Sequence, residues 1–185
     1  GYKPANLIGT VSSEGYENVA VFSSIVHLGS NPPVLGFIMR PTTVPRDTYA
    51  NIKETGCYTI NHIAEDFIEE AHHTSAKYEK NVSEFNIVGL KPEYKNNFIA
   101  PFVAQSPVKI GMKYLEEYYI KANDTIMVIG EIQFFDVNDK MLEDDGFLNL
   151  AKGNIATING LDAYAVPKLN KRFGYQRPKE MNTIK

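Results

Sequence analysis

The sequence predicts a mainly β domain, largely antiparallel, with a few helices inserted between strands. Short runs rich in β-branched and aromatic residues recur along the chain, separated by turn-forming residues. Helical patterns are too few to alternate with the strands as crossover units. Six or more strands with helices as insertions favour a largely antiparallel barrel over a doubly wound sheet.

The chain of 185 residues is interpreted as a single domain, 1–185. That length can bury a continuous core without disulfides or metals as staples. No internal repeat, low-complexity tract or long linker divides it. Since the sequence does not begin with Met and only Gly1 to Ala5 precede the first expected strand, we expect Gly1 to be either an added residue or the truncated edge of a longer protein.

The first half carries most of the strand signals. Asn6–Ser12 and Glu17–Val26 flank the turn-like residues 13–15 and are expected to form a hairpin. Asn31-Pro32-Pro33 then interrupts the chain, since proline cannot continue a sheet ladder. Val34–Met39 follows as a buried strand.

Two helices are expected between strands. The first spans Asp47–Glu54, with Asp47 or Thr48 as its cap and Gly56 just beyond its end. Tyr58–Ile63 reads as a strand. The second helix spans Glu65–Ser75, where apolar residues fall on one face, and 78–107 is expected to hold loops and short helical turns.

Two long strands are predicted in the second half. They are Val108–Lys121 and Thr125–Asn138, joined by a turn at 122–124. Within the first of them, Tyr114–Tyr119 is expected to be a strand with an exposed acidic edge.

Composition excludes several functional classes. A net charge of −3 and a sequence pI of about 5.8 argue against nucleic-acid binding, which usually needs a basic patch. No apolar run is long enough to suggest a membrane span, and no signal-peptide pattern is present, so we expect a cytoplasmic protein. The single cysteine, Cys57, cannot form an internal disulfide and is expected to be a buried small apolar residue.

Common cofactor motifs are missing. Neither the G-x-G-x-x-G fingerprint nor the P-loop motif occurs. His72 and His73 are adjacent, so on a helix they do not converge on a metal as an i, i+4 pair would, and no metal site is expected.

The segment from Met39 to Thr48 concentrates arginine and threonine just ahead of the first expected helix. Guanidinium groups and hydroxyls can hold a phosphate, and a helix N-terminus offers free N–H groups. The candidate phosphate ligands are Arg40, Thr42, Thr43, Arg46 and Thr48. The alternative is a polar loop with a capped helix, in which the arginines pair with Asp47 or Glu54 at the surface.

Several motifs follow one another in an order that resembles a known family. They are Asn18–Ser24, Asn31–Met39, Arg40 with Arg46-Asp47-Thr48 and Asn51-Ile52, and Gly56–Asn61. This order resembles the flavin reductase-like, FMN-binding split-barrel family, and the flavoredoxin-like subgroup most closely. The resemblance covers nearly the whole chain.

The resemblance implies a six-stranded FMN-binding split β-barrel that forms a homodimer, with FMN near the subunit interface. Asn18, Val19 and Ala20 would lie along the isoalloxazine ring, and the arginine and threonine cluster would hold the phosphate. Three further residues would flank the ribityl chain or phosphate: Phe22, Ser23 and Ser24. Asn61 and Tyr78 are additional candidates for the pocket.

The implied chemistry belongs to the flavin, so no catalytic residue of the protein is identified. NADH or NADPH would be the co-substrate, and free flavin or an electron-acceptor protein would receive the electrons. One alternative is a non-enzymatic FMN electron carrier reduced by a partner protein, and another is a ligand-binding module without redox function. The basic run Lys168–Arg177 is interpreted as solvated surface or a dimer contact rather than a nucleotide phosphate site.

Overall fold

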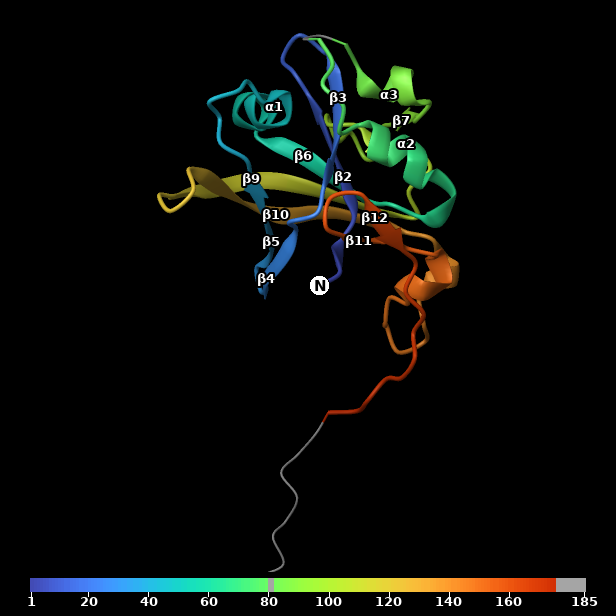
Figure 1. Ribbon diagram of the computed structural model, residues 1–185. Coiled ribbons are helices and arrows are strands. Elements are labelled where there is room, and N and C mark those ends of the chain that lie inside the picture. Colours follow the sequence, from blue (N-terminus) through green and yellow to red (C-terminus); the bar gives the residue numbers. More distant parts are fainter. Residues whose placement is uncertain (80–81, 176–185) are drawn as a thin grey trace, which may run out of the picture.

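Two long neighbouring strands cross the whole molecule. In the computed structural model, which describes residues 1–79 and 82–175, β9 (Val108–Ile120) and β10 (Thr125–Val137) form an antiparallel hairpin (Figure 1). The first five residues of β9 are buried, whereas most of its second half is exposed. The expected hairpin is therefore confirmed, whereas the acidic residues of Tyr114–Tyr119 are only in part exposed, because Glu116 faces solvent and Glu117 is half-buried.

These two strands lie at the centre of a seven-stranded sheet in which every pairing is antiparallel. The order across the sheet is β3-β2-β6-β9-β10-β5-β4. The other five strands are β2 (Asn6–Val11), β3 (Glu17–Phe22), β4 (Val26–Ser30), β5 (Pro33–Met39) and β6 (Cys57–His62). The predicted fold class, a mainly β antiparallel barrel with helical insertions, is confirmed.

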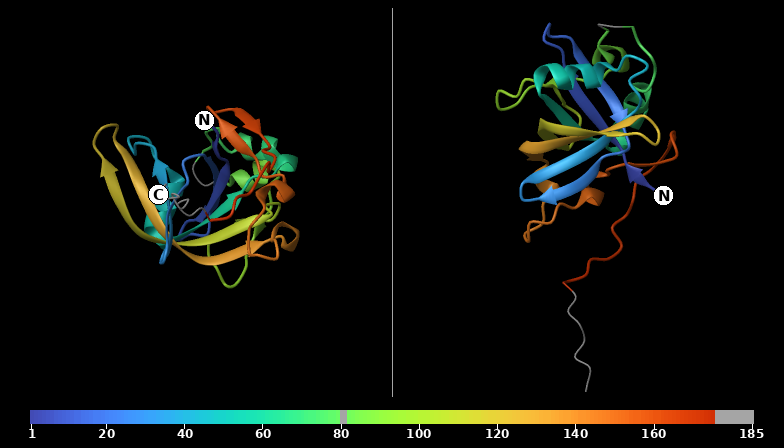
Figure 2. Two further views of the ribbon diagram at one scale, coloured as in Figure 1. Left: turned by 90° about the horizontal axis from the view of Figure 1, so that it is seen from below. Right: turned by 90° about the vertical axis from the view of Figure 1, so that its left-hand side faces the viewer.

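The two edges of the sheet approach each other where β3 is joined to β4. These two strands are the opposite edges of the sheet, yet only Ser23 to Ile25 separate them in the chain. A link this short spans at most about 14 Å, so the two edges must approach each other at that point. The curvature that this requires is visible in Figure 2.

The single strand predicted over Glu17–Val26 is therefore wrong. β3 ends at Phe22, and the Ser24 hydroxyl then forms hydrogen bonds with the backbone of β5. Ser24 Oγ accepts a hydrogen bond from the Ile38 N–H (3.0 Å) and donates one to the Ile38 carbonyl (3.2 Å). A side chain thus replaces the ladder bonds that a continuous strand would have made.

The α-helices cover one side of the sheet (Figure 1), and they are α1 (Asp47–Thr55), α2 (Ile68–His73) and α3 (Glu84–Val88). The 3-10 turn η1 (Glu65–Phe67) leads into α2, whereas η2 (Asp139–Met141) and η3 (Leu150–Gly153) pack against each other at the lower right in Figure 1. Gly56 ends α1 in the left-handed region, with φ of 70°, and its N–H bonds to the Ile52 carbonyl at 2.9 Å. The second predicted helix is a 3-10 turn that continues into α2.

Short strands complete the described part of the chain. They are β1 (Lys3–Pro4), β7 (Pro92–Glu93), β8 (Phe102–Val103), β11 (Thr157–Asn159) and β12 (Ala163–Ala165). β1 pairs with β11, so the N-terminus joins a small sheet formed near the end of the chain. His72 of α2 hydrogen-bonds the Tyr164 hydroxyl through Nδ1 at 3.1 Å and fixes β12 against the helices.

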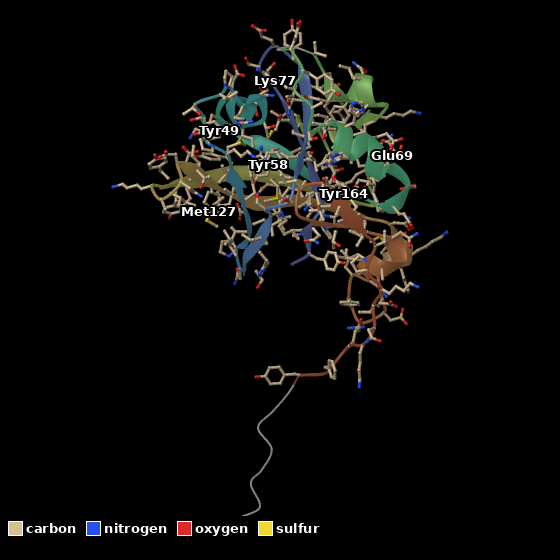
Figure 3. The ribbon with its side chains drawn as sticks, viewed as in Figure 1. Tyr49, Tyr58, Glu69, Lys77, Met127 and Tyr164 are labelled. Carbon is tan, nitrogen blue, oxygen red and sulfur yellow. The ribbon has the colours of Figure 1, made fainter. Side chains whose placement is uncertain are left out.

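Aromatic rings fill the interior between β3, β5 and β6. Phe37 contacts Phe22 and Tyr58 edge to face, with ring centroids 5.2 and 5.6 Å apart. Tyr58 is fully buried and burial raises its pKa (Figure 3). Its hydroxyl lies against Gly130, where an added Cβ would collide with it, which explains a glycine inside a β-branched strand.

Cys57 differs from its prediction. It is only partly buried, at the start of β6, rather than enclosed in the core. Burial still raises the pKa of its thiol, which disfavours the reactive thiolate. Among the helices of the described residues, none is long and apolar enough to cross a membrane.

Candidate functional site

The two segments predicted to form the site meet in space. Asn18 of β3 donates a hydrogen bond from Nδ2 to Thr48 Oγ1 in α1, at 3.0 Å. Ser24 binds the backbone of Ile38, two residues before Arg40. The segment from Asn18 to Ser24 is thus held beside the elements that flank the turn from residue 40 to residue 46, called here the arginine turn.

Most polar side chains of the arginine turn face solvent. Arg40, Thr42 and Thr43 are exposed, and Arg46 is partly buried. Arg46 Nε is enclosed and has no hydrogen-bond partner in the part of the chain that the structure describes. A buried donor without a partner costs free energy, which a phosphate oxygen at this position would recover.

The N-terminus of α1 lacks a side-chain cap. Its N-cap residue is Arg46, in an extended conformation, and not Asp47 or Thr48 as predicted. Asp47 is exposed in the first turn of the helix. The Thr48 hydroxyl accepts a hydrogen bond from the Asn18 amide instead of capping the helix. The first N–H groups of the helix are therefore left without a side-chain acceptor, an arrangement that favours a bound anion.

The predicted surface pairing of the two arginines is not found. Within residues 1–79 and 82–175, neither Arg40 nor Arg46 forms an ion pair. Glu54 instead binds the Ser13 backbone N–H at 3.0 Å and also the Ser13 hydroxyl. The two guanidinium groups of the arginine turn are therefore not neutralised by a carboxylate among the described residues.

A buried cluster fixes the helix that carries this site. Thr10 Oγ1 accepts hydrogen bonds from Asn18 Nδ2 (3.3 Å) and Asn51 Nδ2 (3.1 Å). Together with Thr48, these residues form the interior polar cluster, which links β2, β3 and α1. The start of α1, and with it Arg46, is therefore positioned by hydrogen bonds inside the fold.

The remaining β3 candidates differ in what they expose. Val19 is fully buried, and its backbone N–H donates to Glu84 Oε2 at 3.2 Å. Ala20 and Phe22 are partly exposed and, by strand alternation, lie on the same side as Asn18. Ser23 and Ser24 are also partly exposed and follow directly at the end of the strand.

Sequence reasoning assigned no role to Glu84, which comes from α3. Burial raises the pKa of its carboxyl group, and Asp47 raises it further. The contact with Val19 joins residues 65 positions apart, so no local motif could have indicated it.

Two other predicted residues lie apart from the arginine turn. Asn61 is fully buried and is hydrogen-bonded to the Leu7 carbonyl, the Thr59 hydroxyl and the Val103 N–H. Tyr78 is partly exposed, and its hydroxyl donates to the His73 carbonyl at 3.4 Å. The structure brings neither residue into contact with the arginine turn.

A second set of contacts, also missed from the sequence, holds α1 on the long hairpin. Tyr49, labelled in Figure 3, donates to Glu117 Oε1 at 2.9 Å, and Lys53 pairs with Glu117 at 3.3 Å. Lys53 also donates to the Tyr114 hydroxyl at 2.8 Å. Burial, followed by the Glu117 carboxylate, raises the pKa of Tyr49.

The titratable groups do not suggest a metal centre. In the described ranges, no three His, Cys, Asp or Glu side chains are arranged to hold a metal ion. The chemistry that the arginine turn offers is instead that of an anion site: two guanidinium groups, two exposed hydroxyls and an uncapped helix N-terminus.

Comparison with known proteins gives a consistent family. Residues 3–159 match the profile of the flavin reductase-like domain. A split-barrel protein from Shewanella frigidimarina, provisionally assigned as a flavin reductase, is 45% identical with a TM-score of 0.91, over 95% of this chain and 87% of that chain. A protein of Aquifex aeolicus without an assigned function is 27% identical over 81% of this chain and 76% of its own length.

The flavoredoxin of Desulfovibrio vulgaris shares the fold at lower identity. It superposes with a TM-score of 0.82 and is 23% identical, over 94% of this chain and 91% of that chain. At this level of identity the likeness concerns the fold alone.

Proposed function

The chain belongs to the flavin reductase-like family, and we propose that it binds FMN at the arginine turn and passes electrons from NADH or NADPH through it. One observation carries this proposal. Arg46 Nε is buried without a partner among the described residues, at the uncapped N-terminus of α1 and beside the exposed hydroxyls of the arginine turn. The two guanidinium groups and the hydroxyls are the kinds of donor that a phosphate such as that of FMN accepts from.

Each part of the site then has a distinct task. Arg40 and Arg46 hold the phosphate, and Thr42 and Thr43 donate hydroxyl hydrogen bonds to it. Ala20 and Phe22 present a small and a flat apolar surface along which the flavin ring is placed. FMN bound there would supply the redox chemistry, since flavins exchange electrons in one-electron and two-electron steps.

The protein itself contributes position and electrostatics. The interior polar cluster keeps α1 in place. The Glu84 carboxylate accepts a hydrogen bond from the Val19 N–H of the edge strand β3. Because the chemistry is borne by the flavin, no acid–base pair of the protein is required.

We further propose a homodimer in the cytoplasm that delivers electrons to free flavin or to an acceptor protein. The relative from Shewanella frigidimarina, provisionally a flavin reductase, supports the reductase assignment through its 45% identity. Large apolar side chains are exposed on β4 (Val26 and Leu28) and near the last described residues (Phe173 and Tyr175). Such exposed apolar side chains support pairing of two copies.

The deciding experiment is a turnover assay after identification of the flavin. The purified protein should show flavin absorbance, and mass spectrometry of the released cofactor should give FMN rather than FAD. With FMN bound, it should oxidise NADH or NADPH over many turnovers. Bound FMN without turnover on either nucleotide would rule out the reductase and leave the electron carrier, provided that chemical reductant and oxygen cycle the flavin.

A further inference from the structure

Strand β3 is one edge of the sheet, and its main-chain groups alternate between β2 and the open side. In the hairpin with β2, the Ser12 N–H donates to the Tyr16 carbonyl at 3.0 Å. In an antiparallel ladder every second residue exchanges hydrogen bonds with the partner strand, so the even-numbered residues of β3 face β2. The N–H and C=O groups of Val19 and Val21 therefore face the open edge, where β3 has no neighbouring strand in the described part of the chain.

The two outward-facing residues differ in what they bind. The Val19 N–H donates to Glu84 Oε2 at 3.2 Å. The Val21 N–H has no hydrogen-bond acceptor within residues 1–79 and 82–175. The Val21 side chain packs against the hydrophobic core, so its main-chain groups are held in a fixed place at the edge. One donor of this edge is thus closed by a carboxylate, and the next is open.

Glu84 is held at Val19 by the helix that carries it. It is the first residue of α3, which lies beside β3 near the top of Figure 1. Phe85 is fully buried and Val88 is 8% exposed, so the helix is anchored in the core directly after Glu84. The carboxylate is therefore positioned by packing, and not only by its own hydrogen bond.

We infer that Glu84 is a positioning residue for the flavin: it closes the edge of β3 at Val19, so that the polar edge of the ring binds the main chain at Val21. The pyrimidine part of a flavin carries one N–H donor between two carbonyl acceptors, which match the C=O and N–H groups of Val21. Ala20 and Phe22, on either side of Val21, present the apolar surface along the ring. This inference rests on the proposed function and specifies where on β3 the ring lies.

The position at Val21 agrees with a phosphate at the arginine turn. Three residues after Val21, Ser24 is hydrogen-bonded to the backbone of Ile38, two residues before Arg40. The open part of β3 and the start of the arginine turn are thus joined by a short path. A single FMN, with its ring and its phosphate at opposite ends of the ribityl chain, can therefore contact both.

Glu84 also brings a negative charge close to the ring. Residues two apart on a strand are separated by about 7 Å, so a ring atom bound at Val21 lies about that far from the carboxylate bound at Val19. Reduction adds negative charge to a flavin, and a charge beside the ring is one means by which a protein adjusts its potential. The Glu84 carboxylate should therefore disfavour the reduced flavin.

Amide hydrogen exchange followed by NMR tests the position of the ring. In the parent, saturating FMN should slow exchange of the Val21 N–H by about tenfold or more, because the amide gains an acceptor. Exchange at Val19 should change little, since Glu84 already binds that N–H. In Glu84→Ala, the Val19 N–H should exchange fast without FMN and slowly with it. Exchange at Val21 that does not respond to bound FMN, or a Val19 N–H in Glu84→Ala that does not respond, would overturn the inference.

The reduction potential of the bound flavin tests the charge, and it does so in a variant that keeps the shape of the side chain. Glu84→Gln retains an oxygen that accepts from the Val19 N–H. Its reduced FMN should bind about tenfold more tightly relative to oxidised FMN than in the parent, which raises the two-electron potential by about 30 mV. Spectroelectrochemical titration at pH 8 makes the measurement, since burial raises the pKa of Glu84 and a higher pH favours its ionised form.

Glu14→Gln is the matched control, because it removes the same charge from an exposed position in the turn between β2 and β3. Its potential should equal that of the parent. Equal potentials for the parent and Glu84→Gln, or an equal rise in both variants, would show that Glu84 only holds α3 against β3.

FMN affinity of the parent, measured by titration, separates this inference from the proposed function. A parent that binds no FMN would refute the proposed function and this inference with it. A parent that binds FMN, with exchange at Val21 and the potential of Glu84→Gln both unchanged, would refute the role of Glu84 alone.

Discussion

The interior polar cluster and the arginine turn both lie at the start of α1 and are opposite in their hydrogen bonding. In the cluster, Thr10, Asn18, Thr48 and Asn51 are buried and bind one another. In the arginine turn, most polar side chains are exposed, and Arg46 Nε is buried without a described partner. Both regions are rich in polar side chains, yet only in the cluster do these side chains find their hydrogen-bond partners within the fold.

This difference indicates how structural and ligand-binding polar residues can be told apart. A buried group whose partners lie within the chain contributes to stability, and its removal leaves those partners unsatisfied. A group without such partners costs little stability when removed and is available to a ligand. The contrast therefore predicts separate effects on folding and on FMN affinity.

The largest expected effect is on folding and concerns Asn61. Asn61→Ala removes the partners of the Leu7 carbonyl and the Val103 N–H, both in the interior. We expect the free energy of unfolding to fall by about 3 kcal/mol, as for other losses of a buried hydrogen-bonding side chain. Urea denaturation measures it, with Asn159→Ala at an exposed position of β11 as the control.

The same variant tests the role predicted for Asn61 at the flavin. If Asn61 is saturated by the fold, the folded variant should bind FMN with nearly parental affinity. A large loss of FMN affinity with unchanged unfolding energy would assign Asn61 to the ligand and break the comparison.

The next effect is on binding and concerns the arginine turn. Arg46→Ala should weaken FMN binding by about 1.5–3 kcal/mol, because a charge-assisted hydrogen bond is lost. Riboflavin, which lacks the phosphate, should bind parent and variant alike. Isothermal titration with both flavins makes the measurement.

Arg46→Lys retains the charge without the planar guanidinium, so its FMN affinity should lie between those of the parent and Arg46→Ala. Arg40 is expected to behave like Arg46, with a smaller loss of affinity because its side chain is exposed. Unchanged FMN affinity in both alanine variants would show that the phosphate lies elsewhere.

The sequence predicted much of the fold because its signals are local. Strand composition and turn residues located β2, β5, β6, β9 and β10 to within a few residues. It failed between β3 and β4, where Ser23–Ile25 crosses from one sheet edge to the other. The Ser24 contact that diverts the chain lies 14 positions away along the sequence, at Ile38, and alternation cannot reveal it.

The site was predictable in the same limited way. The order of the motifs identified the two segments that meet. It did not show which of their side chains are hydrogen-bonded within the fold and so are not available to a ligand. Asn18 and Thr48 were predicted to lie beside the flavin. In the structure the Asn18 amide donates a hydrogen bond to the Thr48 hydroxyl. The supporting contacts of Glu84 and Glu117 depend on tertiary pairing, so they had no signal in the sequence.

A pH effect on stability tests a second buried side chain whose partner lies within the chain. His62 bonds to Asn6 through Nδ1, and burial lowers the pKa of His62 to about 4 from its usual 6.5. Between these values the unfolded chain binds the proton and the folded chain does not, so acid favours unfolding. Stability should be complete above pH 6.5 and fall by about 1–2 kcal/mol on approaching pH 4, less than the full shift implies because His62 stays partly exposed.

Denaturation over this pH range should show the slope in the parent protein. His62→Gln should flatten it, whereas His73→Gln, at an exposed position, should leave it intact. An unchanged slope in His62→Gln would assign the acid sensitivity to other groups.

The smallest effects come from a matched pair of threonines within the site. Thr48→Val removes the acceptor of Asn18 and should lower the unfolding free energy by about 1 kcal/mol, because a buried amide N–H loses its partner. Thr43→Val removes an exposed hydroxyl and should leave unfolding unchanged but weaken FMN binding by about 0.5–1 kcal/mol. Since both substitutions keep shape and remove one hydroxyl, opposite outcomes in the two measurements follow from hydrogen-bond saturation alone. If Thr48→Val instead reduced FMN affinity as much as Thr43→Val did, saturation within the fold would not distinguish positioning residues from ligands.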